Sequence, residues 1–197
     1  MEGVHPPPGM QGINGLGSEG FLGMQQMPMP SLNPINPMQQ LMQMQEELAP
    51  LNYRKIKQYL IESNEEIRVC ATLQALRWRL TKTKRKQLVK LVIHAYQHFD
   101  LLDCKKAARA AIEDDPASIL IEGLLTGPRK VLEYTMTFVN ALASECLGRS
   151  YLLQKPDLVE LLVNMLHDEQ GDTNLRQCAL GTLQKFSLRR RPQTIMI

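Results

Sequence analysis

What the sequence lacks narrows the class of protein. Its first 50 residues contain no lysine or arginine and no continuous apolar segment. A secretory signal peptide needs a basic segment followed by an apolar one, so we expect no signal peptide at this end of the chain. No stretch of the sequence approaches the roughly 18–20 apolar residues that a membrane-spanning helix requires. We therefore expect a cytoplasmic or nuclear protein without a transmembrane segment.

Cysteine is scarce and widely spaced. Cys70, Cys104, Cys146 and Cys178 form no Cys-x-x-Cys pair, and each lies in or beside an apolar helical stretch. Four scattered cysteines in a chain of this length do not suggest a disulfide framework. The pattern favours reduced thiols in the core of the protein.

Motifs that carry catalysis or cofactor binding are also missing. The sequence has no Gly-rich phosphate loop and no Gly-x-Ser-x-Gly elbow. His94 and His98 have the four-residue spacing of a zinc pair, but no glutamate lies between them and no third ligand is near in the sequence. We therefore expect no catalytic set, no metal site, no cofactor and no small-molecule substrate.

Composition divides the chain into two regions. Residues 1–36 are rich in Pro, Gly, Met and Gln, and eight of the 11 Met residues precede position 45. Such a segment cannot bury enough apolar surface to offset its chain entropy. We predict a disordered tail over 1–36 and a short amphipathic helix or linker over 37–50.

The last third of the chain repeats one pattern of apolar residues. The first part of the pattern recurs after 42 residues, and the second part, past a slightly longer loop, recurs after 44. Ile119, Leu120, Leu124, Val131, Val139, Leu142 and Tyr151 correspond to Leu161, Leu162, Leu166, Leu175, Leu183, Phe186 and Ile195. A period of about 40–47 residues with two or three helices is typical of armadillo and HEAT arrays. We predict an all-α, armadillo/HEAT-like helical-repeat solenoid, with its helical N-terminal part over 51–115 and armadillo-like repeats over 116–197, the last one incomplete.

Apolar spacing and Pro or Gly corners place the individual helices. We expect them over 53–61, from Ser63 to about Leu80, from Thr81 or Thr83 through Phe99, from Asp115-Pro116 through Leu125, and over 128–147, 157–167 and 174–188. Ser63 with Glu66 has the pattern of a capping box. Gly148 is expected to end the helix over 128–147. Trp78 is expected in the core, with an arginine on its face.

Basic residues are concentrated in one run, and no acidic residue occurs from 67 to 99. The run comprises Arg77, Arg79, Lys82, Lys84, Arg85, Lys86 and Lys90. A solvated helix start explains such a run. That interpretation is the one that charge runs of this kind favour. The alternatives are a nuclear-localisation segment, or a dock for an acidic partner such as tubulin tails, phospholipid or nucleic acid. A second cluster, Arg189, Arg190 and Arg191, follows an apolar helix, where cations favour the helix dipole and a partner-facing role stays open.

Several long strings of residues resemble one vertebrate family. They are Leu51 to Tyr53, Leu73 to Thr81, Asp100 to Cys104, Asn140 to Leu152, and Leu183 to Arg190. Over roughly 51–197 these strings are similar, in order, to the armadillo repeat-containing protein nine family of ciliary LisH-domain proteins. The resemblance implies a non-enzymatic interaction scaffold of the basal body, centriole and cilium, acting in cilium assembly and stability and in Hedgehog signalling.

The same resemblance implies a location and a class of partner. We expect the chain in the cytoplasm and cytoskeleton, at the centrosome or centriole, the basal body and the cilium. Its partners would be centrosomal, ciliary and microtubule-associated proteins. The alternative is a nuclear or nucleic-acid-binding armadillo adaptor that uses the basic run over 77–90.

The chain also departs from the family pattern. Residues 1–50 resemble neither a LisH domain nor a coiled coil, so LisH-mediated dimerisation is not carried over. The family continues into further repeats beyond the position of Ile197, and we therefore expect a truncated member. Phe186, Leu188, Ile195 and Ile197 would then lie at an uncovered repeat end, because helical arrays need a polar cap.

Overall fold

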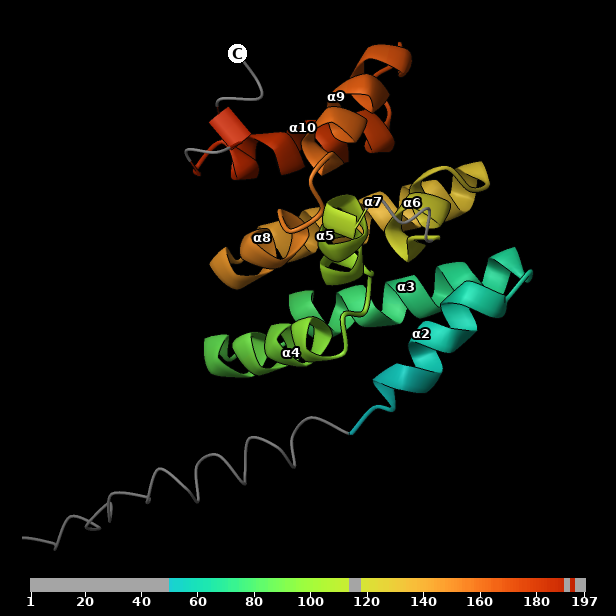
Figure 1. Cartoon of the computed structure of the whole chain (residues 1–197), viewed down its shortest axis with the longest axis vertical. Helices are drawn as coiled ribbons and strands as arrows, with labels where there is room; N and C mark the ends of the chain where they lie inside the picture. The colour runs from blue at the N-terminus through green and yellow to red at the C-terminus, as the bar shows by residue number, and fades with distance from the viewer. Residues whose placement is uncertain (1–49, 114–117, 190–191, 194–197) are drawn as a thin grey trace, which may run out of the picture. The chain divides into compact units, whose positions relative to one another are not determined.

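A computed structural model describes residues 50–113, 118–189 and 192–193, and these residues form helices and the turns between them (Figure 1). The helices are α2 (Tyr53–Glu62), α3 (Glu66–Thr81), α4 (Lys86–His98), α5 (Cys104–Glu113), α6 (Leu120–Leu125), α7 (Arg129–Ala143), α8 (Cys146–Leu152), α9 (Leu158–Asp168) and α10 (Asn174–Phe186). No strand occurs among these residues, and the predicted all-α fold is confirmed. The tail over 1–36, and all but the last residue of the segment over 37–50, lie outside the described residues.

Three long helices form the spine of the array. Helix α7 packs against α3 on one side and α10 on the other (Figure 1). The shorter helix before each of the last two spine helices packs on its successor, α6 on α7 and α9 on α10. The same helix pair therefore occurs twice, as the repeated apolar pattern indicates, and the helical-repeat fold is confirmed.

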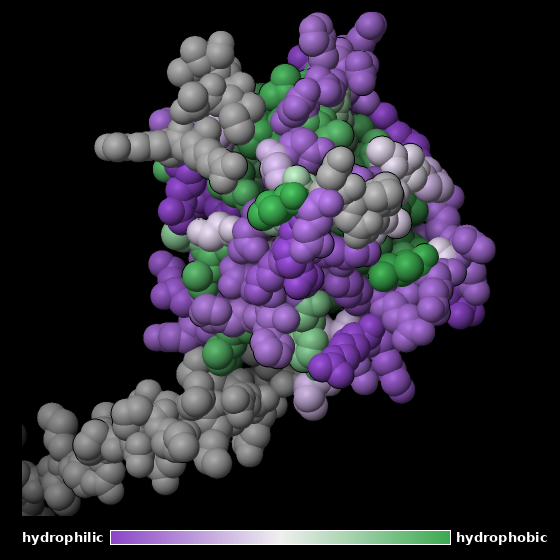
Figure 2. Space-filling model, viewed as in Figure 1, coloured by the Kyte–Doolittle hydropathy of each residue, from purple (hydrophilic) through white to green (hydrophobic). Residues whose placement is uncertain are grey.

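The repeated apolar residues form the core. In the first copy all seven are buried. In the second copy Leu162, Leu175, Leu183 and Phe186 are buried and Leu161 and Leu166 are half-buried, while Ile195 lies outside the described residues. Burying a Leu or Phe side chain contributes roughly 1.5–3 kcal/mol, so the pattern supplies much of the stability of the array. The outer face seen in Figure 2 is mostly hydrophilic, with apolar side chains showing in separate areas.

Four aromatic residues lie together where the first helices meet α7. The Tyr53 ring lies 5.6 Å from that of Tyr96 and 5.4 Å from that of Phe99, and the Tyr96 ring lies 5.8 Å from that of Phe138. The Tyr96 hydroxyl donates to the carbonyl of Leu76 at 2.9 Å. Edge and stacked ring contacts of this kind add about 0.5–1.5 kcal/mol each beyond area burial. They join α2, α3, α4 and α7.

The turn between α4 and α5 has an unusual backbone. Asp100 and Asp103 have φ angles of 45° and 62°, a left-handed region that residues other than glycine rarely adopt. Aspartate tolerates this region because its side chain can bond to nearby backbone. The Asp100 carboxylate accepts from the backbone N–H groups of Lys105 at 3.0 Å and Lys106 at 2.9 Å. These bonds satisfy the first turn of α5.

Tyr151 of α8 reaches this turn from the next repeat. Its hydroxyl donates to Asp100 Oδ1 at 2.9 Å and accepts from the backbone N–H of Leu102 at 2.8 Å. Burial, more than the nearby Cys104 and Asp100, raises the pKa of Tyr151. Burial thus favours the protonated hydroxyl, the form that can donate to Asp100.

Lys57 ties α2 to the same turn. Its ammonium donates to the carbonyl of Asp100 at 2.7 Å and lies 2.5 Å from Asp103 Oδ1. The other oxygen of Asp103 accepts from the backbone N–H of Leu120, at the start of α6, at 3.1 Å. The Asp103 side chain is only 3% exposed, so these partners take the place of the water that an exposed carboxylate would bind.

The helix starts differ in detail from those expected. Ser63 does not cap α3, because it closes α2 instead, and its Oγ accepts from the backbone N–H of Glu65 at 3.2 Å. Glu65 is the residue before α3 and makes no capping bond through its side chain. Thr83 does not start α4, since its hydroxyl donates back to the carbonyl of Arg79 at 2.6 Å. The apolar spacing predicts no separate helix at α5, because the buried side of this helix consists only of Cys104 and Ala107.

The long helix expected over 128–147 is broken, and that prediction is wrong. Helix α7 ends at Ala143, and α8 begins at Cys146. Gly148 does not end a helix but lies within α8 and is buried. A Cβ atom on Gly148 would stand 1.9 Å from the carbonyl oxygen of Leu142, so only glycine allows α8 to approach the end of α7 so closely.

We predict that Gly148→Ala destabilises the protein by about 1–3 kcal/mol or more, because the added methyl group must displace backbone. The loss would be measured as a fall in the midpoint of urea unfolding.

The matched control is Gly123→Ala in α6. Gly123 is exposed, and a Cβ there would meet nothing within 4 Å. Removing a flexible glycine from a helix should stabilise by roughly 0.5–1 kcal/mol. Equal effects of the two changes would contradict the close approach of α8 to α7.

Candidate interaction surface

The predicted basic run lies on one connected part of the fold. It covers the C-terminal end of α3, the turn that follows, and the first half of α4. We name its residues the α3–α4 basic surface: Arg77, Arg79, Lys82, Lys84, Arg85, Lys86 and Lys90. Arg77 and Arg79 are half-buried and the other five are exposed or partly exposed. A helix end and the next helix start thus bring residues of similar charge together.

Most cations of this surface have no ion-pair partner among the described residues. Arg77, Lys82, Lys84, Lys86 and Lys90 form no ion pair with any described residue. Arg79 by contrast hydrogen-bonds with the buried Tyr53. The surface can therefore hold an anion without first breaking ion pairs of the described part of the protein.

Trp78 lies beside these cations and not in the core, so the position predicted from its apolar neighbours is wrong. Its side chain is 43% exposed. The cation on its face is Lys82, whose Nζ lies 3.8 Å from the ring centroid, and not an arginine. With the Gln74 amide oxygen turned toward the indole, Trp78 Nε1 donates to it at 2.9 Å. The expected core position fails because Trp78 lies on the opposite side of α3 from Leu73, Leu76 and Leu80.

The second predicted basic cluster is only partly described. Arg189 Nη2 donates to Cys146 Sγ at 2.7 Å and to Ser150 Oγ at 3.1 Å, which ties the end of α10 to α8. Arg190 and Arg191 lie outside the described residues. Structural contacts within the array therefore explain Arg189.

The expected repeat end is also only partly described. Leu188 is 69% exposed, but Phe186 is fully buried, so the expectation of exposure is wrong for Phe186. The reason is that Phe186 belongs to the core-facing side of α10, together with Leu183 and Ala179. Ile195 and Ile197 lie outside the described residues.

The cysteines and histidines do not gather into a ligand set. All four cysteines are free, and three are buried as expected, but Cys146 is exposed. His94 and His98 are exposed on α4. Within the described ranges no group of three or more His, Cys, Asp or Glu residues could hold a metal ion. None of the described helices is long and apolar enough to cross a membrane.

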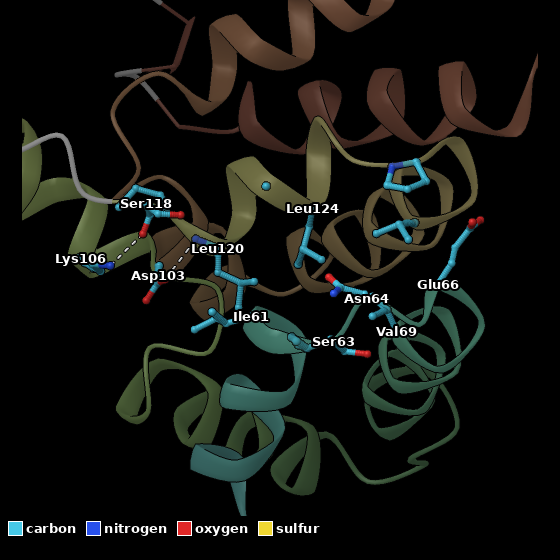
Figure 3. A pocket seen from close by; sticks show the side chains of 15 residues that line it. Ile61, Ser63, Asn64, Glu66, Val69, Asp103, Lys106, Ser118, Leu120 and Leu124 are labelled. Carbon is cyan, nitrogen blue, oxygen red and sulfur yellow. Dashed lines mark hydrogen bonds between the residues drawn. The ribbon is translucent and has the colours of Figure 1, made fainter.

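A cavity of about 450 Å³ lies where the end of α2 and the start of α3 face α6 (Figure 3). Its walls are largely apolar, with Leu60, Val69, Leu120 and Leu124 among them. The buried carboxylate of Asp103 at its edge is already paired with Lys57. Sequence reasoning missed this cavity because its walls come from three separate segments. With such walls it can accept an apolar group.

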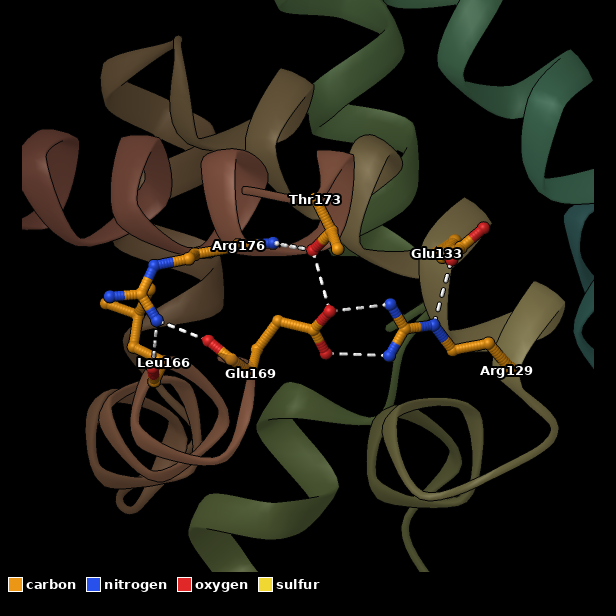
Figure 4. Close-up of polar contacts among 6 residues, drawn as sticks. All are labelled: Arg129, Glu133, Leu166, Glu169, Thr173 and Arg176. Atoms are coloured by element: carbon orange, nitrogen blue, oxygen red, sulfur yellow. Dashed lines mark hydrogen bonds and ion pairs between the residues drawn. The ribbon is translucent and has the colours of Figure 1, made fainter. Parts of the chain in front are cut away.

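A polar network joins the last two repeats (Figure 4). Arg129, at the start of α7, makes a two-pronged contact with Glu169 at 2.7 and 2.8 Å and also bonds Glu133 at 2.9 Å. The Thr173 hydroxyl donates to Glu169 at 2.8 Å. Arg176 donates to the backbone carbonyl of the same glutamate and completes the turn before α10. The network fixes the turn between α9 and α10 on the preceding repeat.

The bond from Arg129, followed by that from Thr173, lowers the pKa of Glu169 to about 2. The same pairing raises the pKa of Arg129. Charge-assisted, two-pronged contacts of this kind are among the stronger polar contacts in proteins. Their role here is structural, because both charges are matched within the fold.

Comparison with known proteins gives one consistent group of relatives. LisH domain-containing protein ARMC9 of Bos taurus is 37% identical over 150 residues, which cover 76% of this chain and 21% of the relative. The Xenopus laevis protein of that name is 38% identical over 157 residues, 79% of this chain and 18% of the relative. The Homo sapiens protein is 37% identical over 150 residues, 76% of this chain and 17% of the relative.

The chain thus spans about a fifth of the length of the curated relatives that it matches. No family model matches it, and no solved structure matches it.

We predict that Glu169→Gln removes an acid-sensitive part of the stability. Because folding lowers the pKa of Glu169 from 4.5 to about 2, its contribution is complete above about pH 4.5 and is lost as the pH falls toward 2. Unfolding midpoints measured from pH 7 down to acid should therefore converge for the wild type and the variant.

Asp168→Asn serves as the control, since Asp168 is exposed and forms no ion pair among the described residues. A wild-type advantage over Glu169→Gln that persists unchanged at pH 2 would contradict the role of this pair.

Proposed function

This chain belongs to the family of LisH domain-containing protein ARMC9, and we propose that it is a non-enzymatic protein-interaction scaffold of the basal body, centriole and cilium. A helical array offers an extended surface for binding other proteins. The observation that carries the proposal is that the acidic and the basic residues of the array differ in how they are used. The carboxylates of Asp100, Asp103 and Glu169 bond to other helices, whereas five of the seven cations of the α3–α4 basic surface form no ion pair with a described residue.

The specific role in this proposal follows from the resemblance of residues 51–197 to the ciliary family. In this role the chain acts in cilium assembly and stability and in Hedgehog signalling. Its partners are centrosomal, ciliary and microtubule-associated proteins. Its place is the cytoplasm and cytoskeleton, at the centrosome or centriole, the basal body and the cilium.

A tagged full chain expressed in ciliated cells tests the scaffold proposal. We expect foci that coincide with a centriole marker and co-purification of basal-body or axonemal proteins. Diffuse fluorescence, with no such proteins retained, would count against the proposal. Gly148→Ala serves as a folding control, because loss of foci in that variant shows that the signal needs the folded array.

A second candidate function is a nuclear or nucleic-acid-binding adaptor. The exposed cations of the α3–α4 basic surface and the neighbouring Trp78 favour it, since cations contact phosphates and an exposed indole can stack on a base. Only one tryptophan occurs in the chain, which makes an extended stacking platform for bases a weaker match.

Nucleic-acid binding is tested with Lys84→Ala, Arg85→Ala and Lys86→Ala combined. If the adaptor function holds, affinity for single-stranded DNA falls. The slope of log K against log salt should also decrease by roughly 0.7 for each phosphate that the variant no longer neutralises. Binding by the wild type that does not depend on salt, or no binding, removes this candidate.

A further inference from the structure

The α3–α4 basic surface concentrates one sign of charge. Between Arg77 and Lys90 the chain carries seven cations and no anion, and the absence of acidic residues extends from 67 to 99. Cations held close together on a surface attract anions and raise their local concentration. Because so many of these charges lack an ionic partner among the described residues, a bound anion gains attraction without competing for them.

The side chain of Trp78 is fixed beside these charges by its neighbours. The Gln74 amide fixes one edge of the indole, and Lys82 covers one face. A side chain that is already fixed loses little conformational freedom when a partner binds. Tryptophan is also among the residues that most often dominate binding energy at protein interfaces. The indole therefore offers an apolar anchor within a basic surface.

The same side of α3 carries further exposed apolar residues. Ile67 is 83% exposed, and Ala71 and Ala75 are exposed between it and Trp78. Their spacing places all four on one side of the helix. At 1.5 Å per residue, Ile67 and Trp78 are about 16 Å apart along the axis, with Ala71, Ala75 and the half-buried Gln74 between them. This strip can lie against an aliphatic or aromatic side chain, which a polypeptide has and a phosphate backbone lacks.

We propose that the α3–α4 basic surface and Trp78 together bind an acidic peptide segment of a partner protein, with an apolar side chain of that segment against the indole. The inference rests on the proposed scaffold function and specifies its binding face and its class of partner. Charge complementarity supplies the attraction between the segment and the cations. The Trp78 strip, which runs from Ile67 through Ala71 and Ala75 to Trp78, supplies the preference for a polypeptide over other polyanions.

The test uses the full chain and a labelled glutamate-rich peptide with one central phenylalanine, followed by fluorescence anisotropy. We expect binding that weakens as salt rises, because exposed charge pairs are screened. Lys84→Ala combined with Lys86→Ala should weaken binding by about tenfold. Both residues are exposed and neither forms an ion pair with a described residue, so the variant should remain folded.

Two controls separate this surface from general charge and from folding. Arg109→Ala combined with Lys130→Ala removes two exposed cations from α5 and α7 and should change the affinity by less than about twofold. Trp78→Ala should weaken binding of the phenylalanine peptide by about two- to tenfold. The same substitution should hardly change the affinity for a peptide with alanine at the central position.

Several results would overturn the inference. Equal losses in the two double variants would show that only net charge matters, and equal binding of a glutamine-rich peptide would show that charge does not matter. Tighter binding of oligothymidylate with the same number of charges, or of vesicles containing anionic lipid, would assign the surface to nucleic acid or membrane. A rise in peptide affinity on Glu46→Gln with Glu47→Gln would mean that the chain's own acidic residues occupy it.

The localisation assay in ciliated cells distinguishes failure of the peptide-binding inference from failure of the scaffold proposal. If the peptide does not bind but the tagged wild-type chain still forms centriolar foci, the inference is wrong and the scaffold proposal stands. If the peptide binds as expected but no foci form, the scaffold proposal fails instead.

Discussion

The arrangement of the helices depends on the short turn that contains Asp100 and Asp103. Two aspartates in a left-handed backbone conformation turn their carboxylates inward, where each meets donors from different helices. Lys57 brings in α2, Leu120 brings in α6, and Tyr151 brings in α8. A buried carboxylate without such donors would cost several kcal/mol, so the helices and the turn stabilise one another.

Beyond this turn, polar contacts join each repeat to the next, in addition to the apolar core that the repeats share. The buried ammonium of Lys155 pairs with Glu122 of α6 and with Asp157 before α9. Arg129 and Glu169 then join α7 to the turn before α10. These contacts use several of the acidic residues that lie between helices of the described array. At the α3–α4 corner, by contrast, five cations form no ion pair with a described residue, which leaves them available to a partner.

Periodicity predicted those parts of the fold that depend on local sequence. The repeated Leu and Val positions placed α6, α7, α9 and α10, because a helix must bury one apolar side whatever its neighbours are. Predictions from the local sequence were wrong for Gly148, which does not end a helix, and for Trp78, which is not in the core. Position 148 requires glycine because a Cβ atom there would lie 1.9 Å from the backbone oxygen of Leu142, six residues earlier in the sequence. Trp78 shares a helix with buried leucines but lies on its other side.

The sequence by itself determined the helical class, the repeat and the presence of a basic run, since composition and spacing are properties of the chain alone. Only the tertiary structure decided which charges stay unpaired. Ion pairs such as that of Arg129 with Glu169 join residues 40 positions apart, and no local rule predicts them. The same holds for Tyr151 and Asp100. Whether a charged residue stabilises the fold or remains available to a partner depends on which distant helix packs beside it.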